Sequence, residues 1–237
     1  IHQEELLWFS GGKNLDGYVI DMRERVSSQF ADAGLFTIRA QKSWAMVVSS
    51  NYTSRPGHMD QLHVDLWVDG VNVFCDAGTY SYASEEGQRL VRNESHNTAV
   101  VDNLTQMNSS GPFMIYDWTK RELIHIDDTS FEGKTISQNG YAHVRQIKQI
   151  GASYEITDCV NHDFTLHFHT PCELSLENGK ALLSYRGKIL CVIQSQEPIE
   201  LEKSSRSLFY LKQDATTCLS IRGHVNTNTK TIIEINQ

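Results

Sequence analysis

Apolar and polar residues alternate in short runs along almost the whole chain after residue 34. In the clearest run, 62–68, apolar side chains stand at every second position from Leu62 to Val68. A period of two is typical of a half-buried β-strand. The pair Asp69-Gly70 follows and is typical of a hairpin turn, so residues 71–76 are expected to run back beside 62–68. Further strands are expected at 35–40, 44–51, 97–102, 121–127, 143–150, 154–160, 165–170, 172–176, 181–185, 189–195, 207–212, 218–223 and 231–236.

Turn residues separate these runs, and the longest stretches without a strand pattern are 77–95 and 103–114. Many short strands with turns between them predict an antiparallel sandwich or barrel rather than a wound α/β sheet. Residues 1–9 have the pattern of a helix that ends at Gly11-Gly12, and the residues after them are polar and irregular. We therefore expect the end of a helical region and a linker at 1–33, followed by one all-β domain at 34–237.

Composition narrows the partners of this domain. The chain has 237 residues and a formal net charge of −8. This length is enough for one large β domain with an ample core. The negative charge argues against nucleic acid and against an anionic membrane surface as partners, and the chain contains no apolar run long enough to span a bilayer. The five cysteines show no CxxC spacing, which favours buried, reduced thiols over a disulfide framework.

Two imidazoles and one carboxylate stand at the ends of predicted strands. His58 precedes the strand at 62–68, Asp76 ends the returning strand, and His96 precedes the strand at 97–102. Because a hairpin returns the chain on itself, Asp76 is expected near His58. Zinc binds neutral imidazole nitrogen and carboxylate oxygen, and three protein ligands leave one position open for water or substrate. The alternative is that both histidines are ordinary hydrogen-bonded residues near strand ends.

Several neighbouring side chains are candidates for supporting roles. Asp60 is a candidate to orient one of the imidazoles by a hydrogen bond, or it is a turn or cap residue. Tyr80 and Tyr82 follow the predicted ligand at the strand end, and a phenol close to a cation can act as general acid or base. Strand-end tyrosines are also common in protein cores. Arg89 and Arg92 can hold an anionic substrate, or they are solvated loop charges.

Two further pairs of residues share strand faces. His167 and His169 lie on one face of a predicted strand, where they can bind a metal or contact a sugar, or simply form a partly exposed surface. His143 and Arg145 also share a face. The guanidinium of Arg145 can meet a substrate carboxylate, or it can form a cross-strand ion pair.

Three motifs in order, GHMDQLHVDLWVDG, VFCDAGTYSY and RNESHNTAVVDN, resemble the C-terminal β-sandwich domain of the heparinase II/III-like polysaccharide lyases. The similarity continues more loosely through HVRQI, YEITDCV and LHFHTP, and covers about residues 34–237. The resemblance implies an all-β, antiparallel two-sheet β-sandwich of the supersandwich type. It also accounts for the opening helical pattern, because family members carry an N-terminal α-helical toroid ahead of the sandwich.

Members of that family cleave uronic-acid-containing glycans, glycosaminoglycans among them, by β-elimination. A base removes the proton next to the uronate carboxylate, and an acid protonates the leaving oxygen. The resemblance implies that His58, Asp76 and His96 bind a divalent metal, usually zinc, and that the partners are an acidic polysaccharide and the chain's own toroid. The family's main catalytic residues lie on the toroid and map to no residue here, so Tyr80 and Tyr82 are the candidate substitutes.

The chain departs from the family pattern at one position. Many members have the order His-x-His-x-Asp, and here Pro56 stands in place of the first histidine. A prolyl ring cannot transfer a proton, so either this subgroup works differently or the domain is a non-catalytic carbohydrate-binding or structural module. An unrelated metal-dependent enzyme on a β-barrel is a further alternative. The resemblance favours a bacterial periplasmic or secreted protein, whereas the reduced cysteines leave the cytoplasm open.

Overall fold

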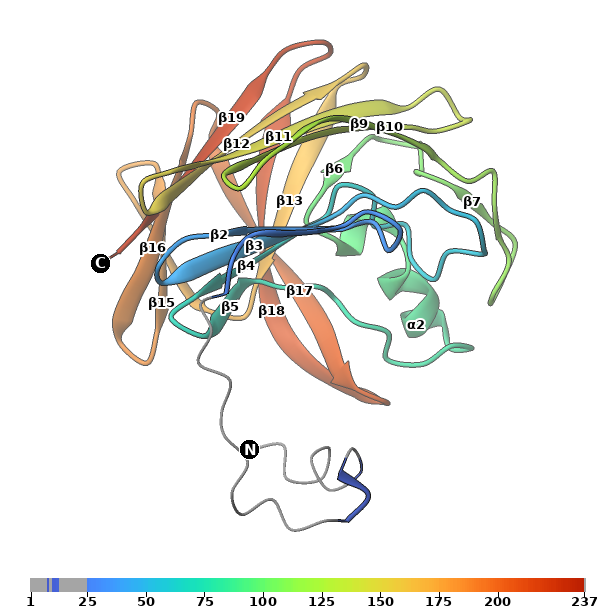
Figure 1. Ribbon diagram of the computed structural model, residues 1–237, viewed down its shortest axis with the longest axis horizontal. Helices are drawn as coiled ribbons and strands as arrows, with labels where there is room; N and C mark the ends of the chain where they lie inside the picture. The colour runs from blue at the N-terminus through green and yellow to red at the C-terminus, as the bar shows by residue number, and fades with distance from the viewer. Residues whose placement is uncertain (1–7, 9, 13–24, 237) are drawn as a thin grey trace.

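The computed structural model describes residue 8, residues 10–12 and residues 25–236, and these are almost entirely β-structure (Figure 1). The helix expected over residues 1–9 lies outside the described residues apart from Trp8, and so does the expected linker up to residue 24. No helix in the described part of the chain is long and apolar enough to cross a lipid bilayer.

Two sheets that meet at one edge form the first layer of the fold. The five-stranded sheet has the order β1 (Ser28–Phe30), β2 (Leu35–Arg39), β3 (Ser43–Val48), β4 (Val64–Val68) and β5 (Val71–Phe74). The four-stranded sheet has the order β17 (Ile199–Phe209), β18 (Lys212–Gly223), β13 (Phe164–Thr170) and β6 (Ala99–Val100). The backbone N–H of Cys75, just after β5, donates to the carbonyl of His169 in β13 at 2.9 Å and connects the two sheets.

One large sheet forms the second layer. Its order is β14 (Glu173–Glu177), β15 (Lys180–Tyr185), β16 (Lys188–Ser195), β19 (Thr229–Ile235), β12 (Ser153–Val160), β11 (Ala142–Ile150), β10 (Ser130–Ile136) and β9 (Lys120–Ile126). Its neighbouring strands are antiparallel. A continuous apolar core joins the layers, with Phe36 of β2 against Phe131 of β10 at 5.2 Å between ring centroids. The predicted antiparallel β-sandwich is therefore confirmed.

The remaining elements gather at one end of the sandwich (Figure 1). They are the short helix α2 (Glu85–Leu90), the 3-10 helix η1 (Asn93–Ser95) and the paired strands β7 (Asn108–Ser109) and β8 (Ile115–Tyr116). Within α2, the hydroxyl of Ser84 accepts a hydrogen bond from the N–H of Gly87, which satisfies a donor that the first helical turn leaves free. In the sequence, α2 and η1 lie between β5 and β6, and β7 and β8 follow β6.

The hairpin between β4 and β5 forms for the reason that the sequence suggested. Asp69 has a φ of 48° and Gly70 a φ of 77°, the left-handed conformations that a tight two-residue hairpin turn requires. The apolar positions Val64, Leu66 and Val68 all face the core. The hairpin fixes the end of β5, and therefore the place where Asp76 leaves the sheet.

Three strand predictions need correction. Residues 28–30, within the expected linker, form β1 and pair with β2. The strand β10 was not expected, because Gly133 interrupts its alternation; a Cβ there would lie 2.6 Å from the Phe131 ring. The segment 207–212, expected as one strand, instead contains the end of β17, the turn at 210–211 and the first residue of β18, and its apolar side chains from Leu208 to Leu211 are exposed.

Candidate functional site

Three side chains from distant parts of the sequence meet where β5 and η1 end. His58 Nδ1 lies 3.3 Å from His96 Nε2, and His96 Nδ1 lies 2.7 Å from Asp76 Oδ2. One candidate ligand atom from each residue lies within 4.8 Å of the other two. His96 is fully buried, whereas His58 and Asp76 are partly exposed. The geometry expected from the hairpin is therefore present, and metal binding by these three residues stays a prediction.

The backbone around Asp76 is shaped by a glycine. The N–H of Gly78 donates to Asp76 Oδ1 at 2.7 Å, and Gly78 has a φ of 69°. A Cβ at Gly78 would lie 2.0 Å from the carbonyl oxygen of Ser207, so only glycine lets the chain pass this close to β17. This turn occupies one carboxylate oxygen of Asp76 and leaves the other facing His96.

His63 is a part of the site that the sequence did not reveal. Its ring is buried, and its Nδ1 accepts a hydrogen bond from the backbone N–H of Asn97 at 2.9 Å. A neutral His63 therefore carries its proton on Nε2, which has no hydrogen-bond partner among the described residues and lies 3.9 Å from Asp76 Oδ2. The N–H at His63 Nε2 is thus placed to orient the Asp76 carboxylate. Its signal in the sequence was a histidine on the non-core face of the predicted strand.

The protonation states suit a cation site. Burial favours the neutral acid, but the charge and hydrogen bond of His96, together with His63 and the Gly78 N–H, hold the pKa of Asp76 well below its usual range. Burial lowers the pKa of His63 to about 3. Burial and the neighbouring His96 also lower the pKa of His58. Burial opposes charging of His96, yet the Asp76 carboxylate raises its pKa, so a bound cation would take the place of a proton here.

Arg145 lies in the core, so of the two roles considered for it the contact with a substrate carboxylate is wrong. Its side chain is fully buried and pairs with Asp158, its cross-strand neighbour, at 2.7 Å. Its Nη1 also donates to the carbonyls of Leu62 and Asn97, both at 2.6 Å. His143 contacts the same Asp158 carboxylate at 2.6 Å. A substrate cannot reach this guanidinium, and the alternative of a cross-strand ion pair is what the structure shows.

Arg145 nevertheless matters for the site. It belongs to β11 of the second layer, while Leu62 precedes β4 and Asn97 precedes β6 in the first layer. Its two carbonyl contacts therefore fix the backbone beside His63 and His96. One buried guanidinium holds together the segments that carry these imidazoles.

Two other predicted contacts are also not as expected. His169 is 5% exposed, and its ring nitrogens contact Ser204 Oγ at 2.9 Å and the carbonyl of Glu94 at 3.1 Å, so it does not face a substrate. Asp60 accepts a hydrogen bond from Tyr52 at 3.5 Å, and in the described part of the chain no hydrogen bond joins it to either histidine of the site.

The predicted tyrosines precede α2, whereas Arg89 lies within this helix rather than in a loop and Arg92 follows it. Tyr82 is 61% exposed and packs on Phe113, with 5.4 Å between the ring centroids. Tyr80 has a φ of 60°, and its carbonyl accepts the N–H of Leu211 at 2.8 Å. Arg89 pairs with Glu86 on the same helix at 2.6 Å. Together with Arg92, Arg89 lines a shallow surface hollow beside α2.

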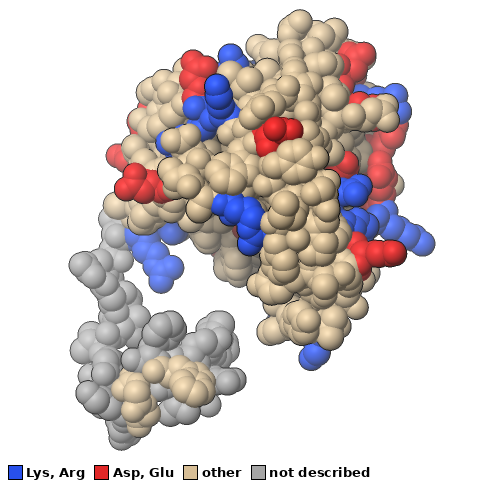
Figure 2. All heavy atoms as spheres, turned by 90° about the vertical axis from the view of Figure 1, so that its right-hand side faces the viewer, with Lys and Arg blue, Asp and Glu red and all other residues tan. Residues whose placement is uncertain are grey.

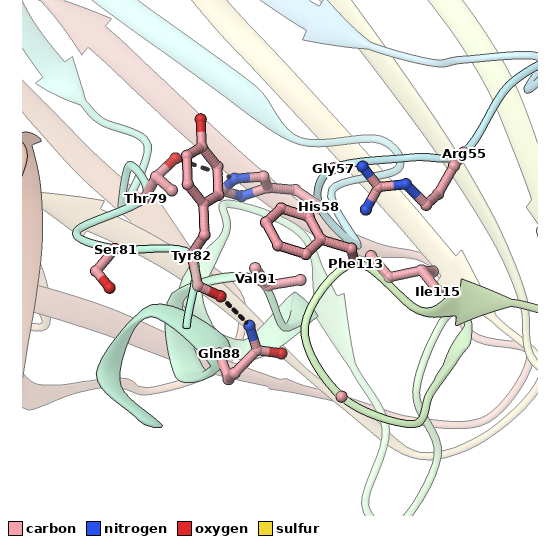
Figure 3. A pocket seen from close by; sticks show the side chains of 11 residues that line it. Arg55, Gly57, His58, Thr79, Ser81, Tyr82, Gln88, Val91, Phe113 and Ile115 are labelled. Carbon is pink, nitrogen blue, oxygen red and sulfur yellow. Dashed lines mark hydrogen bonds between the residues drawn. The ribbon is translucent and has the colours of Figure 1, made fainter. Parts of the chain in front are cut away.

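A pocket of about 250 Å³ opens next to His58 (Figure 3). The ring of Phe113 and the phenol of Tyr82 form one wall, and the guanidinium of Arg55 lies 5.1 Å from the Phe113 ring centroid. Thr79 Oγ1 is 3.4 Å from His58 Nε2 at the inner end. The pocket therefore combines aromatic faces, a cation and the partly exposed edge of the candidate metal site. Arg55 and Phe113 were not identified from the sequence, because they come from irregular loops.

The surface around this end of the molecule is of mixed charge. Figure 2 shows Lys and Arg side chains interspersed with Asp and Glu rather than a continuous field of one sign. Since the chain carries a formal net charge of −8, any attraction for an acidic ligand must be local. Arg55 supplies such a local positive charge within the pocket.

The fold and the site together define the class of domain. It is an antiparallel β-sandwich in which two histidines and one aspartate meet at one end. The chain belongs to the family "Heparinase II/III-like, C-terminal", whose model matches residues 22–234. Membership in this family makes it a polysaccharide-lyase-type domain. No curated protein matches the chain.

Solved structures show the same fold. A heparan sulfate lyase, HepC from Pedobacter heparinus, has a TM-score of 0.74 and 16% identity, over 98% of this chain and 39% of that chain. A heparinase III, the BT4657 gene product, has a TM-score of 0.71 and 18% identity, over 96% of this chain and 38% of that chain. The chain thus spans well under half the length of the solved proteins that it matches.

Proposed function

We propose that this domain binds a divalent cation, zinc, through His58, Asp76 and His96, and forms one wall of a cleft in which an acidic glycan is cleaved by β-elimination. The observation that carries the proposal is the convergence of these three ligands beside a pocket with aromatic and cationic walls, in a member of the heparinase II/III-like family. The glycan class we propose is one that contains uronic acid.

The residues present fit a zinc ion. Two nitrogen ligands about 2.0–2.1 Å from tetrahedral zinc lie roughly 3.3 Å apart. The imidazole nitrogens of His58 and His96 are separated by 3.3 Å. Asp76 is ionised, and its carboxylate is held by the Gly78 N–H and faced by His63. A bound zinc would supply positive charge that neutralises a uronate carboxylate, which makes the neighbouring proton more acidic.

The chain's own residues would bind and orient the sugar. The ring of Phe113 and the phenol of Tyr82 offer flat apolar faces for a pyranose ring. The guanidinium of Arg55 can pair with a uronate carboxylate in a two-pronged contact. Tyr82 is exposed at the mouth, where its hydroxyl can donate a proton to a leaving oxygen. We therefore favour Tyr82 over Tyr80 as a catalytic candidate in this domain.

The opposite wall of the cleft, in this proposal, belongs to an N-terminal α-toroid. The solved relatives are more than twice as long as this chain, since it covers only 37% to 40% of their length. The base that removes the proton would come from that toroid. The 237-residue chain is therefore expected to bind zinc and sugar but to show no lyase turnover by itself.

A specific observation favours a second candidate function. Pro56 stands where the resemblance predicts a proton-transferring histidine, and its ring is buried. A domain with this substitution could bind an acidic glycan, or support the toroid, without taking part in cleavage. This candidate shares the metal and the pocket with the first and differs only in the chemical step.

Zinc content tests the metal part of the proposal. After dialysis against zinc and removal of loosely bound ion, elemental analysis of His58→Ala and His96→Ala should show one equivalent less than the unmodified chain. The matched control is His125→Ala, because His125 is an exposed strand histidine that pairs with Asp127, outside the triad. Equal zinc contents in His58→Ala and in the control would contradict the proposed site.

Ultraviolet absorbance of the unsaturated uronate product tests the chemical part. The protein with both the toroid and this domain is mixed with a panel of uronate polymers, and the 237-residue chain is assayed in parallel. Product from the longer protein alone supports eliminative cleavage. Glycan binding without product on the whole panel supports the non-catalytic candidate instead, and robust turnover by the 237-residue chain would contradict the proposed division of the active site.

A further inference from the structure

The four-stranded sheet carries a second group of metal-ligating side chains. In the pairing of β13 with β18, His169 lies opposite Cys218 and His167 lies opposite Ser220. Residues directly opposite each other in an antiparallel pair share a face of the sheet. His167, His169 and Cys218 therefore stand together, and one candidate ligand atom from each lies within 4.8 Å of the other two. None of them belongs to the triad at His58.

Hydrogen bonds to a single carbonyl orient both imidazoles. His167 Nδ1 lies 3.0 Å and His169 Nε2 lies 3.1 Å from the carbonyl oxygen of Glu94. A carbonyl can only accept, so both of these nitrogens carry hydrogen, which leaves lone pairs on His167 Nε2 and His169 Nδ1. The latter accepts the hydroxyl of Ser204 at 2.9 Å. Metal-binding histidines commonly donate their other N–H to a carbonyl in this way, which fixes the tautomer and the ring orientation.

Cys218 offers a thiol without a strong competing partner. It is a free cysteine, 3% exposed, and its Sγ lies 3.6 Å from the carbonyl of Leu219 and 3.9 Å from Ser220 Oγ. Burial raises the pKa of the Cys218 thiol to about 12, so the thiol keeps its proton until a cation replaces it. Burial lowers the pKa of His169 to about 3, which keeps that imidazole in its ligand form.

Glu202 lies on the next strand. It stands opposite Cys218 in β17, and its carboxylate accepts the hydroxyl of Ser220 at 3.0 Å. Glu202 is exposed and is not one of the three residues whose ligand atoms converge. Three protein ligands leave one position of a tetrahedral ion open for water or another ligand.

We propose that His167, His169 and Cys218 form a second zinc site, which joins β13 to β18 through two imidazole nitrogens and one thiolate. Thiolate and imidazole ligands together select zinc or other soft ions over magnesium and calcium. When zinc binds, the thiol proton leaves to solvent and the zinc–sulfur bond takes its place. Bond lengths of about 2.0 and 2.3 Å require ligand atoms roughly 3.3–3.7 Å apart.

Cobalt titration of the metal-free 237-residue chain tests this site, because cobalt occupies zinc sites and reports thiolate ligation by a near-ultraviolet charge-transfer band. We expect two equivalents bound, one of which produces the band. Cys218→Ser should lose the band and one equivalent, and should keep the other. Cys159→Ser is the matched control, since Cys159 is a partly exposed thiol outside the cluster, and it should keep both.

The two proposed sites can fail separately. His58→Ala should retain the charge-transfer band, because the triad contains no sulfur. Loss of only the cobalt equivalent that gives no charge-transfer band confirms that the sites are independent. A band that persists in Cys218→Ser, or that is absent from the unmodified chain, overturns the second site. If circular dichroism shows that Cys218→Ser does not fold, His167→Ala replaces it, because His167 is partly exposed, and the same loss is required.

Discussion

Replacing Arg145 by Met tests how the core supports the site. The substitution keeps an unbranched side chain of similar reach but removes the charge and all donors. Asp158 then loses its bonds at 2.7 and 3.2 Å and keeps only His143. The carbonyl of Leu62 loses the guanidinium as a donor, and the carbonyl of Asn97 loses one donor but keeps the N–H of Val64 at 3.2 Å. The perturbation is therefore a buried charge without its main partner, plus the loss of one hydrogen bond at each of two carbonyls.

The expected cost is large on the scale of domain stability. Removal of one partner of a buried ion pair costs about 3–5 kcal/mol, and an unsatisfied buried acceptor costs about 1–3 kcal/mol. Because these contributions overlap, we expect Arg145→Met to lower the free energy of unfolding by roughly 4 kcal/mol or more. A second substitution, Asp158→Asn in the same chain, removes the orphaned charge and should restore about 2 kcal/mol of this, leaving the part that comes from the carbonyls.

Urea unfolding measures these free energies by linear extrapolation, with an unchanged m-value as the sign that the denatured state is unaffected. Zinc affinity of the folded variant, measured by competition with a chelating dye, should also fall, because the lost carbonyl bonds hold the backbone beside His63 and His96. A cost below about 1 kcal/mol would refute the assigned role of the ion pair. Full recovery of stability and zinc affinity in the double variant would show that the carbonyl bonds contribute nothing.

Three further outcomes follow from individual contacts. His63→Leu should weaken zinc binding at the triad roughly 10- to 100-fold in dye competition, because the Asp76 carboxylate loses the ring behind it; unchanged affinity would argue against that role. Gly78→Ala should lower Tm and the zinc content together, at a cost of about 2 kcal/mol, since its Cβ would meet Ser207 and its φ is 69°. Burial opposes ionisation of Asp158, but Arg145 and His143 hold its pKa below the usual value, so its stabilisation is present above about pH 4 and is lost as pH falls through the folded pKa. The stability gap between the unmodified chain and Asp158→Asn should thus shrink in urea titrations below about pH 4, and a constant gap would contradict the assignment.

The parts of the fold that follow from local chemistry were predictable. The hairpin from β4 to β5 needs only alternating residues and a turn that tolerates positive φ, and the sequence shows both at Asp69-Gly70. The strand β17 was largely missed because its central residues are exposed on both faces, so no alternation marks it. The apolar tip from Leu208 to Leu211 was predicted as part of one separate strand, whereas it contains the end of β17 and the turn into β18, and its apolar side chains are exposed.

The candidate site shows the same division. His58, Asp76 and His96 were identified because each stands at the end of a predicted strand, where a hairpin brings chain ends together. The burial of Arg145 was not predictable, because it depends on a contact with Leu62, 83 residues away in the opposite layer. The orientation of His63 likewise depends on the backbone of Asn97, 34 residues away. Such roles are set by how the two layers pack, which no local pattern records.

The central claim is that a cation binds between His58, Asp76 and His96. The most direct measurement is an anomalous difference map, recorded at the zinc absorption edge, from crystals of the 237-residue chain grown with zinc. The account predicts a peak in bonding contact with all three side chains, and its absence in crystals of His58→Ala. A map without a peak at this place, with the imidazoles and the carboxylate still hydrogen-bonded to one another, would contradict it.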